Sequence, residues 1–230
     1  MPPDRLAAIA DIHGNRHALE AVLEDIDRRG IKTVLNLGDQ LFGPLDHEGT
    51  AALLIARSFP SVSGNQDREL VEQGSPHSSW LASLPLTLQL NGMLLFHGTP
   101  TKDNVYLLET VHPDGVSLAS SKEIKERLGP VTQTLLLCGH THIPRIVQFQ
   151  DCLIVNPGSV GLQAYEDDSP LPHCMETGSP HARYAILERR ETDWHIDLLA
   201  LPYDHESAAQ TALRNGRPDW AHRLRTGRAR

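Results

Sequence analysis

Short apolar runs alternate with amphipathic stretches along the chain. The segment 5–10 carries a continuous apolar run, which is typical of a strand buried on both faces. The segment 15–29 repeats apolar side chains at helical spacing and places Leu19, Val22 and Ile26 on one face. By the same criteria we expect strands at 5–10, 32–37, 60–63, 87–90, 93–97, 134–138, 143–148, 152–155, 184–188 and 195–201. The expected helices are 15–29, 48–57, 121–128 and one that begins at His205.

Turn signals separate pairs of strands in the second half of the chain. Asn91-Gly92 is the strongest of them, because a two-residue loop of this type matches the twist of a hairpin. Gln150-Asp151 separates another pair. A βαβαβ order followed by hairpins predicts an α/β fold with mixed sheets and helices on their faces, arranged as a two-sheet sandwich.

Residues 162–183 interrupt this regular pattern. The segment holds three Pro and the acidic run Glu166-Asp167-Asp168, and it has no periodicity. Structureless stretches of this length in a compact domain are either functional or disordered. We therefore expect a lid or substrate loop here, with plain disorder as the alternative.

The composition narrows the class of protein. A chain of 230 residues with 40% hydrophobic content can form one domain with a core of its own. Its three Cys do not make a disulfide framework. No apolar stretch is long enough to span a bilayer, and the N-terminal apolar run is too short for a signal peptide. These observations predict a cytoplasmic protein with no membrane partner.

The net charge of −8 is unevenly distributed. Residues 213–230 hold six Arg and one Asp, so the rest of the chain is strongly acidic. An acidic body repels nucleic acid and other phosphate polyanions unless bound cations reverse the local field. Nucleic acid is therefore disfavoured as a partner except at the basic segment, which we expect to be a solvated, frayed tail after a domain at 1–212. The oligomeric state does not follow from the sequence.

Side chains that commonly bind metal ions follow the predicted strands. They are Asp11, His13, Asp39, Asn65, His97, His140 and His142. Binding sites in α/β sheets assemble at the carboxyl ends of the strands. Carboxylate, amide and imidazole groups suit divalent first-row metals, and this set is larger than one ion requires. Two ions that share a bridging carboxylate, at the ~3.5–4 Å spacing of hydrolytic pairs, would use all of them.

Each of these motifs has a plainer interpretation when it is taken alone. Asp11 can cap a helix, Asn65 can be a turn residue and His97 can be a core histidine. The last hairpin repeats the Asp-x-His spacing in Asp193-Trp-His195, which we expect on the surface. The joint occurrence of the motifs in chain order, with Gly beside nearly every one, favours the metal site.

The ordered blocks DIHGN, NLGDQLFGP, SGNQD, HG, GHTH and VNPGSVG match a known pattern. In them the sequence resembles the calcineurin-like metallophosphoesterase superfamily, in particular its small bacterial and archaeal phosphodiesterase-type members. The resemblance implies a four-layer αββα sandwich of two mixed β-sheets flanked by helices. It also implies two divalent metal ions as cofactors, with Mn, Fe, Zn, Co or Ni as candidates, and a small-molecule phosphoester as substrate.

The resemblance carries roles to individual positions. It assigns Asp11, His13 and His142 to a first ion, Asn65, His97 and His140 to a second ion, and Asp39 to both as the bridge. It also assigns catalytic roles to Asp39, Asn65, Gln66 and Asp67, and a substrate contact to Gln66. Asn15 and Arg16 follow the first metal motif at the start of the first helix and could reach a phosphate, with an exposed helix residue as the alternative for Arg16. The implied reaction is attack on a phosphoester by a hydroxide that bridges the two ions, in line with the leaving oxygen.

Several residues near these motifs have other interpretations. Ser159 is interpreted as a turn residue and not as a nucleophile, and Asn156 as a residue that fixes a loop beside the metals. His173, Cys174 and His181 could form another metal site, but their irregular spacing disfavours it.

Gln66 departs from the family pattern and decides between functions. Many members have His at this position, where it contacts the scissile phosphate, and Gln can form hydrogen bonds but cannot transfer a proton. A phosphodiesterase acting on small or nucleotide-like diesters is therefore the leading hypothesis. The alternatives are a phosphomonoesterase or phosphoprotein phosphatase, which Gln66 disfavours, and a non-catalytic scaffold on the same fold, which the intact ligand set disfavours.

Overall fold

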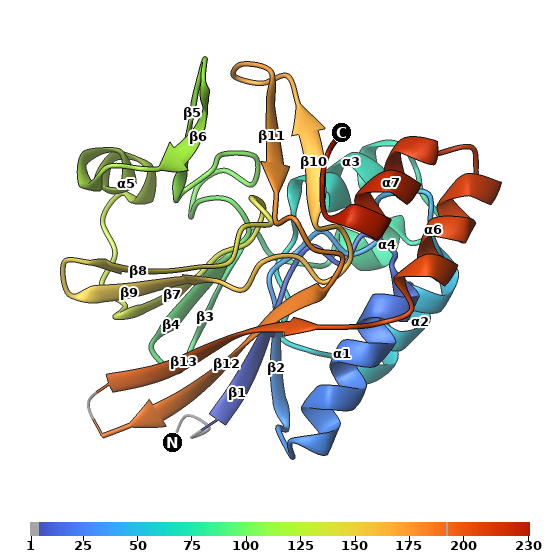
Figure 1. The fold of residues 1–230 in the computed structure, drawn as a ribbon. Helices are drawn as coiled ribbons and strands as arrows, with labels where there is room; N and C mark the ends of the chain where they lie inside the picture. Colours follow the sequence, from blue (N-terminus) through green and yellow to red (C-terminus); the bar gives the residue numbers. More distant parts are fainter. Residues whose placement is uncertain (1–4, 192) are drawn as a thin grey trace.

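Two β-sheets face each other in the computed structural model, which describes residues 5–191 and 193–230 (Figure 1). The four-stranded sheet has the order β13 (Asp193–Leu201), β12 (Ala182–Arg190), β1 (Arg5–Ile9) and β2 (Thr33–Asn36). The five-stranded sheet has the order β3 (Thr87–Leu90), β4 (Met93–Phe96), β7 (Leu135–Leu137), β9 (Cys152–Asn156) and β8 (Arg145–Phe149). Two hairpins stand apart from the sheets: β5 (Glu109–His112) with β6 (Gly115–Leu118), and β10 (Ala164–Asp167) with β11 (His173–Glu176).

The helices of the described residues are α1 (Arg16–Arg28), α2 (His47–Arg57), α3 (Asn65–Glu72), α4 (Ser78–Leu81), α5 (Ser121–Leu128), α6 (His205–Arg214) and α7 (Pro218–Thr226). Helices α1 and α2 pack on the outer face of the four-stranded sheet, and α5 packs on that of the five-stranded sheet. Asn15 begins α1 as its N-cap, with a side-chain oxygen that accepts from Ala18 N–H. Among the helices in the described part of the chain, none is long and apolar enough to cross a membrane.

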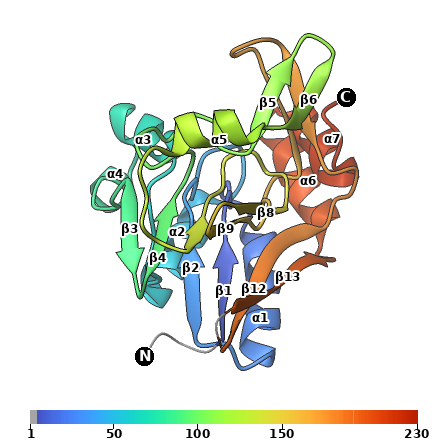
Figure 2. The same ribbon diagram turned by 90° about the vertical axis from the view of Figure 1, so that its left-hand side faces the viewer.

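Successive side chains of β1 point to opposite faces of the four-stranded sheet, and each face has its own hydrophobic core. Leu6 and Ala8 point into the cluster between the two sheets, whereas Ala7 and Ile9 pack against α1 and α2. The five-stranded sheet likewise packs its outer face against α5. The order helix, sheet, sheet, helix confirms the predicted αββα sandwich (Figure 2).

Parallel pairing determines where the strands end. β1 pairs with β2 in parallel, and β7 lies between β4 and β9 and is parallel to both. Parallel strands end at the same edge of a sheet, so the loops after β1 and β2 emerge together, as do those after β4 and β7. These loops carry most of the predicted metal ligands.

One predicted strand is wrong. Residues 60–63 contribute an isolated bridge between Asn36 and Ser61 and no strand. Asn65 consequently begins α3 instead of following a strand. The sequence also did not predict α3, α4 and the β5–β6 hairpin, because elements this short contain too few apolar residues to show a period.

The irregular segment 162–183 is neither disordered nor structureless. It forms the β10–β11 hairpin, in which Tyr165 pairs with Met175 and Asp167 with His173. The hairpin projects from the same end of the sandwich as β5–β6 (Figure 1). The acidic run concealed this strand, because Glu166 and Asp167 interrupt an otherwise strand-like sequence.

The predicted frayed tail at 213–230 is also wrong. Half of it is α7, which buries Trp220 and Leu224 against α6 and Leu162. Five of the segment's six arginines form ion pairs instead of a free basic surface, as Arg225 does with Glu206 at 2.6 Å. The boundary expected after residue 212 falls inside α6.

Replacement of Leu224 tests whether α7 is part of the folded core. Leu224 is 0% exposed, so Leu224→Ala is expected to lower the free energy of unfolding by about 2–5 kcal/mol. Leu213→Ala on α6 is the matched control, because Leu213 is 38% exposed and its loss is expected to cost about 0.5 kcal/mol or less. Urea denaturation measures both values. Equal effects of the two substitutions would mean that the C-terminal segment is frayed in solution.

Candidate metal centre

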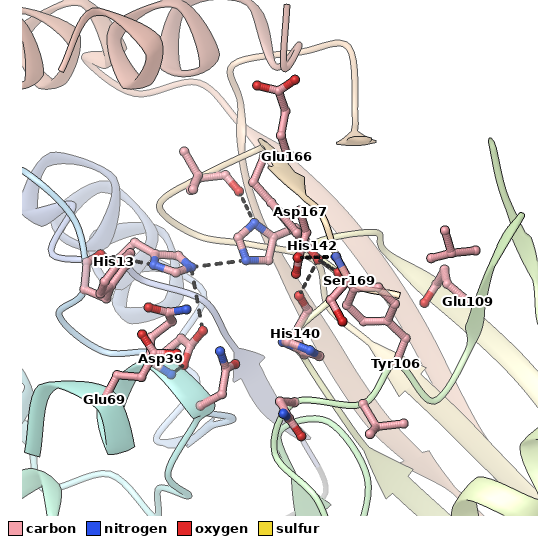
Figure 3. Close-up of a pocket in the computed structure, with 18 of the residues that line it drawn as sticks. His13, Asp39, Glu69, Tyr106, Glu109, His140, His142, Glu166, Asp167 and Ser169 are labelled. Carbon is pink, nitrogen blue, oxygen red and sulfur yellow. Dashed lines mark hydrogen bonds and ion pairs between the residues drawn. The ribbon is translucent and has the colours of Figure 1, made fainter. Parts of the chain in front are cut away.

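Loops from both sheets bring the predicted metal ligands into one site (Figure 3). Asp11 and His13 follow β1, Asp39 follows β2, His97 follows β4, His140 and His142 follow β7, and Asn65 is the first residue of α3. All of these side chains are buried except that of His140, which is half-buried. The carboxyl ends of the parallel strands therefore converge as predicted.

The backbone of these loops is left-handed at the ligand positions. Within the described residues, nine residues other than Gly have a positive φ, and five of them are predicted ligands. These five are Asp11, His13, Asp39, His140 and His142, with φ between 54° and 71°. Such conformations are uncommon for residues with a Cβ and concentrate at functional sites.

The ligand atoms form two clusters with one carboxylate between them. The clusters are Asp11, His13 and His142, and Asp39, His97 and His140, each with its ligand atoms within 4.8 Å of one another. Asp39 Oδ2 lies 3.3 Å from His97 Nε2 in its own cluster and 3.9 Å from His13 Nε2 in the other. The Asp39 carboxylate therefore faces both clusters.

Backbone carbonyl groups orient three of the four histidines. The pairs are His13 Nδ1 with Phe42 O at 3.1 Å, His97 Nδ1 with Leu37 O at 2.7 Å and His142 Nδ1 with Leu162 O at 2.6 Å. Because a carbonyl oxygen only accepts, each Nδ1 carries a proton, and Nε2 is the ring nitrogen left to bind a metal ion. His13 Nε2 and His142 Nε2 are 3.1 Å apart, so both nitrogens face the same small volume.

The charges in the site also favour bound cations. Burial and the neighbouring ring of His142 lower the pKa of His13 to about 4, so this ring is neutral near pH 7. Burial and the charge of His97 likewise lower the pKa of His140 to about 4. Burial alone would lower the pKa of His97, but the carboxylates of Asp39 and Asp11 raise it to about 10. The buried negative charge thus attracts a proton, and a metal ion can take that role.

Asp67 supports the Asp39 loop. Its carboxylate accepts hydrogen bonds from the backbone N–H groups of Asp39 at 2.9 Å, Gln40 at 2.8 Å and Gly64 at 2.9 Å. The backbone N–H of Gln66 donates to Asp39 Oδ1 at 2.9 Å and leaves Oδ2 facing the clusters. These bonds fix both the loop and the direction of the Asp39 carboxylate.

The donor set fits divalent metal ions. Asn65 Oδ1 and Gln66 Oε1 are buried, and neither has a hydrogen-bond partner among residues 5–191 and 193–230. An orphaned amide oxygen beside imidazoles and carboxylates is a suitable additional ligand for a first-row metal. Asn65 is therefore well placed to complete the cluster of Asp39, His97 and His140.

Two residues expected to contact substrate do not reach the site. Asn15 is 1% exposed and its amide donates to Gly161 O at 2.8 Å and to Tyr203 Oη at 3.1 Å. Arg16 is exposed and pairs with Glu20 at 2.8 Å. Neither Asn15 nor Arg16 lines the cavity over the clusters, whereas Gln66 does.

A cavity of about 860 Å³ opens over both clusters. Its walls include residues that the sequence did not single out, among them Tyr106, Tyr165 and Trp220. Tyr165 packs against the ring of His142 at 4.6 Å between centroids, and Trp220 against His13 at 5.9 Å. The i, i+4 pair Trp220 and Leu224 between Pro218 and Gly227 was a usable sequence signal for the α7 wall.

Other sequence interpretations agree with the structure. Asn156 donates to Gly139 O at 2.8 Å and so holds the loop that carries His140. Ser159 lies in the loop after β9 and donates to Asp11 O at 2.7 Å. The sequence disfavoured a further metal site at His173, Cys174 and His181. Within the described residues, these three side chains do not form a cluster of ligand atoms. Asp193 and His195 lie exposed on β13.

Comparisons with known proteins agree with this site. The model of the calcineurin-like phosphoesterase superfamily domain matches residues 5–177. An uncharacterized protein from Methanocaldococcus jannaschii is 27% identical over 259 residues, which cover 99% of this chain and 100% of that protein.

Solved structures share the fold. A metallophosphoesterase from Sphaerobacter thermophilus superposes with a TM-score of 0.76 at 22% identity, over 96% of this chain and 97% of that one. A hypothetical protein from Pyrococcus horikoshii OT3 gives a TM-score of 0.67 at 16% identity, over 97% and 98%. The chain therefore belongs to the calcineurin-like phosphoesterase superfamily. It is a metallophosphoesterase, that is, a metal-dependent hydrolase of phosphoester bonds.

Replacement of Gly64 tests how tightly the Asp39 loop is packed. A Cβ at Gly64 would lie 2.0 Å from Asp39 Oδ1, so Gly64→Ala must displace the carboxylate. We expect metal affinity to fall by about 10–100-fold, the usual effect of disturbing a group that orients a ligand. Isothermal titration with Mn²⁺ measures the affinity. Gly74→Asn, just after α3, is the control and should leave the affinity unchanged, because nothing lies within 4 Å of a Cβ there and Asn tolerates the positive φ of 70°. Unchanged affinity in Gly64→Ala would contradict the packing described for Asp39.

Proposed function

We propose that this protein hydrolyses phosphodiesters of small or nucleotide-like alcohols at a pair of divalent metal ions. The position of Asp39 carries the proposal. Its Oδ2 lies within 4 Å of a histidine nitrogen from each cluster, which suits a carboxylate shared by two ions. Asp11, His13 and His142 would hold one ion, and Asn65, His97 and His140 the other.

Divalent ions held there would lower the pKa of an attacking water and withdraw charge from the phosphoryl oxygens. The rest of the chemistry depends on this chain's own groups. The carboxamide of Gln66 lines the cavity and can donate a hydrogen bond to a phosphoryl oxygen. Because the N–H protons of a carboxamide are not acidic enough to be transferred, Gln66 can orient the phosphate but cannot protonate the leaving oxygen.

The cavity suits a diester better than a free phosphate. Its volume of about 860 Å³ leaves room for an organic group on each side of a phosphate bound at the clusters. Aromatic rings of Phe42 and Tyr106 line it together with polar groups such as Lys102 and Asn104. Walls of this kind bind an organic substituent by both apolar contact and hydrogen bonds.

Replacement of Asp39 tests the shared ligand. We expect wild-type protein reconstituted with Mn²⁺ to hold about two ions per chain. Asp39→Asn keeps the shape and tolerates the left-handed backbone but removes the charge, so both ions should be lost together. His142→Asn, which alters one cluster, should lose one ion only. Elemental analysis after desalting measures the stoichiometry, and an Asp39→Asn protein that keeps one ion would refute a shared carboxylate.

Leaving-group dependence tests the role of Gln66. Without a proton donor at this position, diesters with acidic phenol leaving groups should react well and alkyl diesters slowly. Gln66→His supplies a group worth about 10²–10⁴ in rate for basic leaving groups, and should therefore flatten the dependence. Initial rates over a series of diesters give the slope for each protein. A wild-type rate that is independent of leaving-group pKa, with the chemical step limiting, would show that another acid serves the site.

A further inference from the structure

His140 is held differently from the other histidines of the centre. The rings of His13, His97 and His142 each donate to a backbone carbonyl, but the ring of His140 makes no hydrogen bond to any other residue that the structure describes. It packs instead between two aromatic rings. The centroid distances are 5.0 Å to His97 and 4.8 Å to Tyr106, at tilts of 53° and 42°.

Tyr106 is itself firmly held, and it lies beside His140 (Figure 3). Its side chain is buried, and its hydroxyl lies 3.0 Å from His173 Nε2. His173 Nδ1 is 2.7 Å from Leu171 O and must donate to it, so His173 Nε2 accepts a hydrogen bond from the Tyr106 hydroxyl. The edge of the His173 ring also packs on Tyr106, at 5.6 Å between centroids.

Tyr165 of the β10–β11 hairpin contacts the loop between β7 and β8, which carries His140 and His142. The Tyr165 hydroxyl lies 2.9 Å from Tyr106 Oη and 3.1 Å from the carbonyl oxygen of His140. The Tyr165 ring meets His142 edge-on at 4.6 Å. Both strands of the hairpin therefore contact the loop between β7 and β8. Tyr165 of β10 contacts this loop directly, and His173 of β11 contacts it through Tyr106.

We propose that Tyr106 is the positioning residue for His140, and that the β10–β11 hairpin thereby sets the affinity of the metal ion that His140 binds. The proposal rests on the pair of ions proposed above. A ring without a hydrogen bond loses rotational freedom when it binds an ion, and restricting the ring beforehand raises the affinity. Aromatic packing supplies for His140 the restriction that carbonyl groups supply for the other three rings.

The proposal changes the expected role of the segment 162–183. A simple lid would alter substrate binding and leave the metal content unchanged. If the hairpin positions His140, a change in the hairpin alters the affinity of one ion even when substrate is absent. Metal titration of the substrate-free protein separates these two roles.

The experiment is a two-site calorimetric titration of the metal-free protein with Mn²⁺. His140→Asn first identifies which of the two affinities belongs to the His140 cluster. Tyr106→Leu removes the ring and is expected to weaken that ion by about 10–100-fold, with the other ion unchanged. Tyr106→Phe restores the ring without its hydroxyl and should recover most of the affinity.

Two further variants complete the test. His173→Ala removes the partner of the Tyr106 hydroxyl without touching the ring of His140, and should weaken the same ion less than Tyr106→Leu does. It also serves as the test if Tyr106→Leu does not fold. Phe42→Leu is the matched control, because the Phe42 ring packs near His13 at 6.4 Å, and His13 is already held by the Phe42 backbone carbonyl. This control should leave both affinities unchanged.

Three outcomes would overturn the proposal. They are equal weakening of both ions in Tyr106→Leu, an unchanged His140 ion in both Tyr106→Leu and His173→Ala, and a Phe42→Leu effect as large as that of Tyr106→Leu. The test also separates this proposal from the one it rests on. Wild-type protein that binds fewer than two ions overturns the dinuclear centre and this inference together. Wild-type protein that binds two ions leaves the variants to decide the role of Tyr106.

Discussion

Five of the seven predicted metal ligands have a backbone conformation that residues with a Cβ avoid. The left-handed region costs such a residue about 1–2 kcal/mol, and Asp11, His13 and Asp39 all adopt it. The conformation persists because the two loops bond to each other, from Asp11 N to Gly38 O and from His13 N to Asp39 O, both at 3.0 Å. The two loops thus form one unit, and the parallel pair β1 and β2 holds that unit in place.

The ligand positions could be predicted because strand ends are readable from apolar runs, and parallel strands bring those ends to one edge. Asn65 lies at the site although the strand expected before it is absent, because the bridge at Ser61 leads the chain to the same edge. Asn15 and Arg16 show the limit of this reasoning. They follow His13 along the chain, but at the start of α1 the side chain of Asn15 is buried and that of Arg16 pairs with Glu20 on the surface.

The cavity walls were harder to predict because they come from elements with weak or misleading patterns. The acidic residues of β10 hide the strand that carries Tyr165, and the arginines of α7 hide a helix with a buried Trp220. Tyr106 lies in a stretch without periodicity, and tertiary contacts place it beside His140 and His173. Charge and local pattern indicate exposure only on average. A few apolar side chains at the right spacing are enough to bury a segment that looks solvated.

The position of the first cluster has a consequence for folding kinetics. His13 follows a strand of one sheet and His142 a strand of the other, 129 residues further along the chain. Contacts between positions so distant form only after most of the chain is assembled. An ion that needs both side chains therefore cannot guide early folding. An ion held by both side chains would be a reversible cross-link between the two sheets, and because it binds only the native state it would shift the folding equilibrium toward that state.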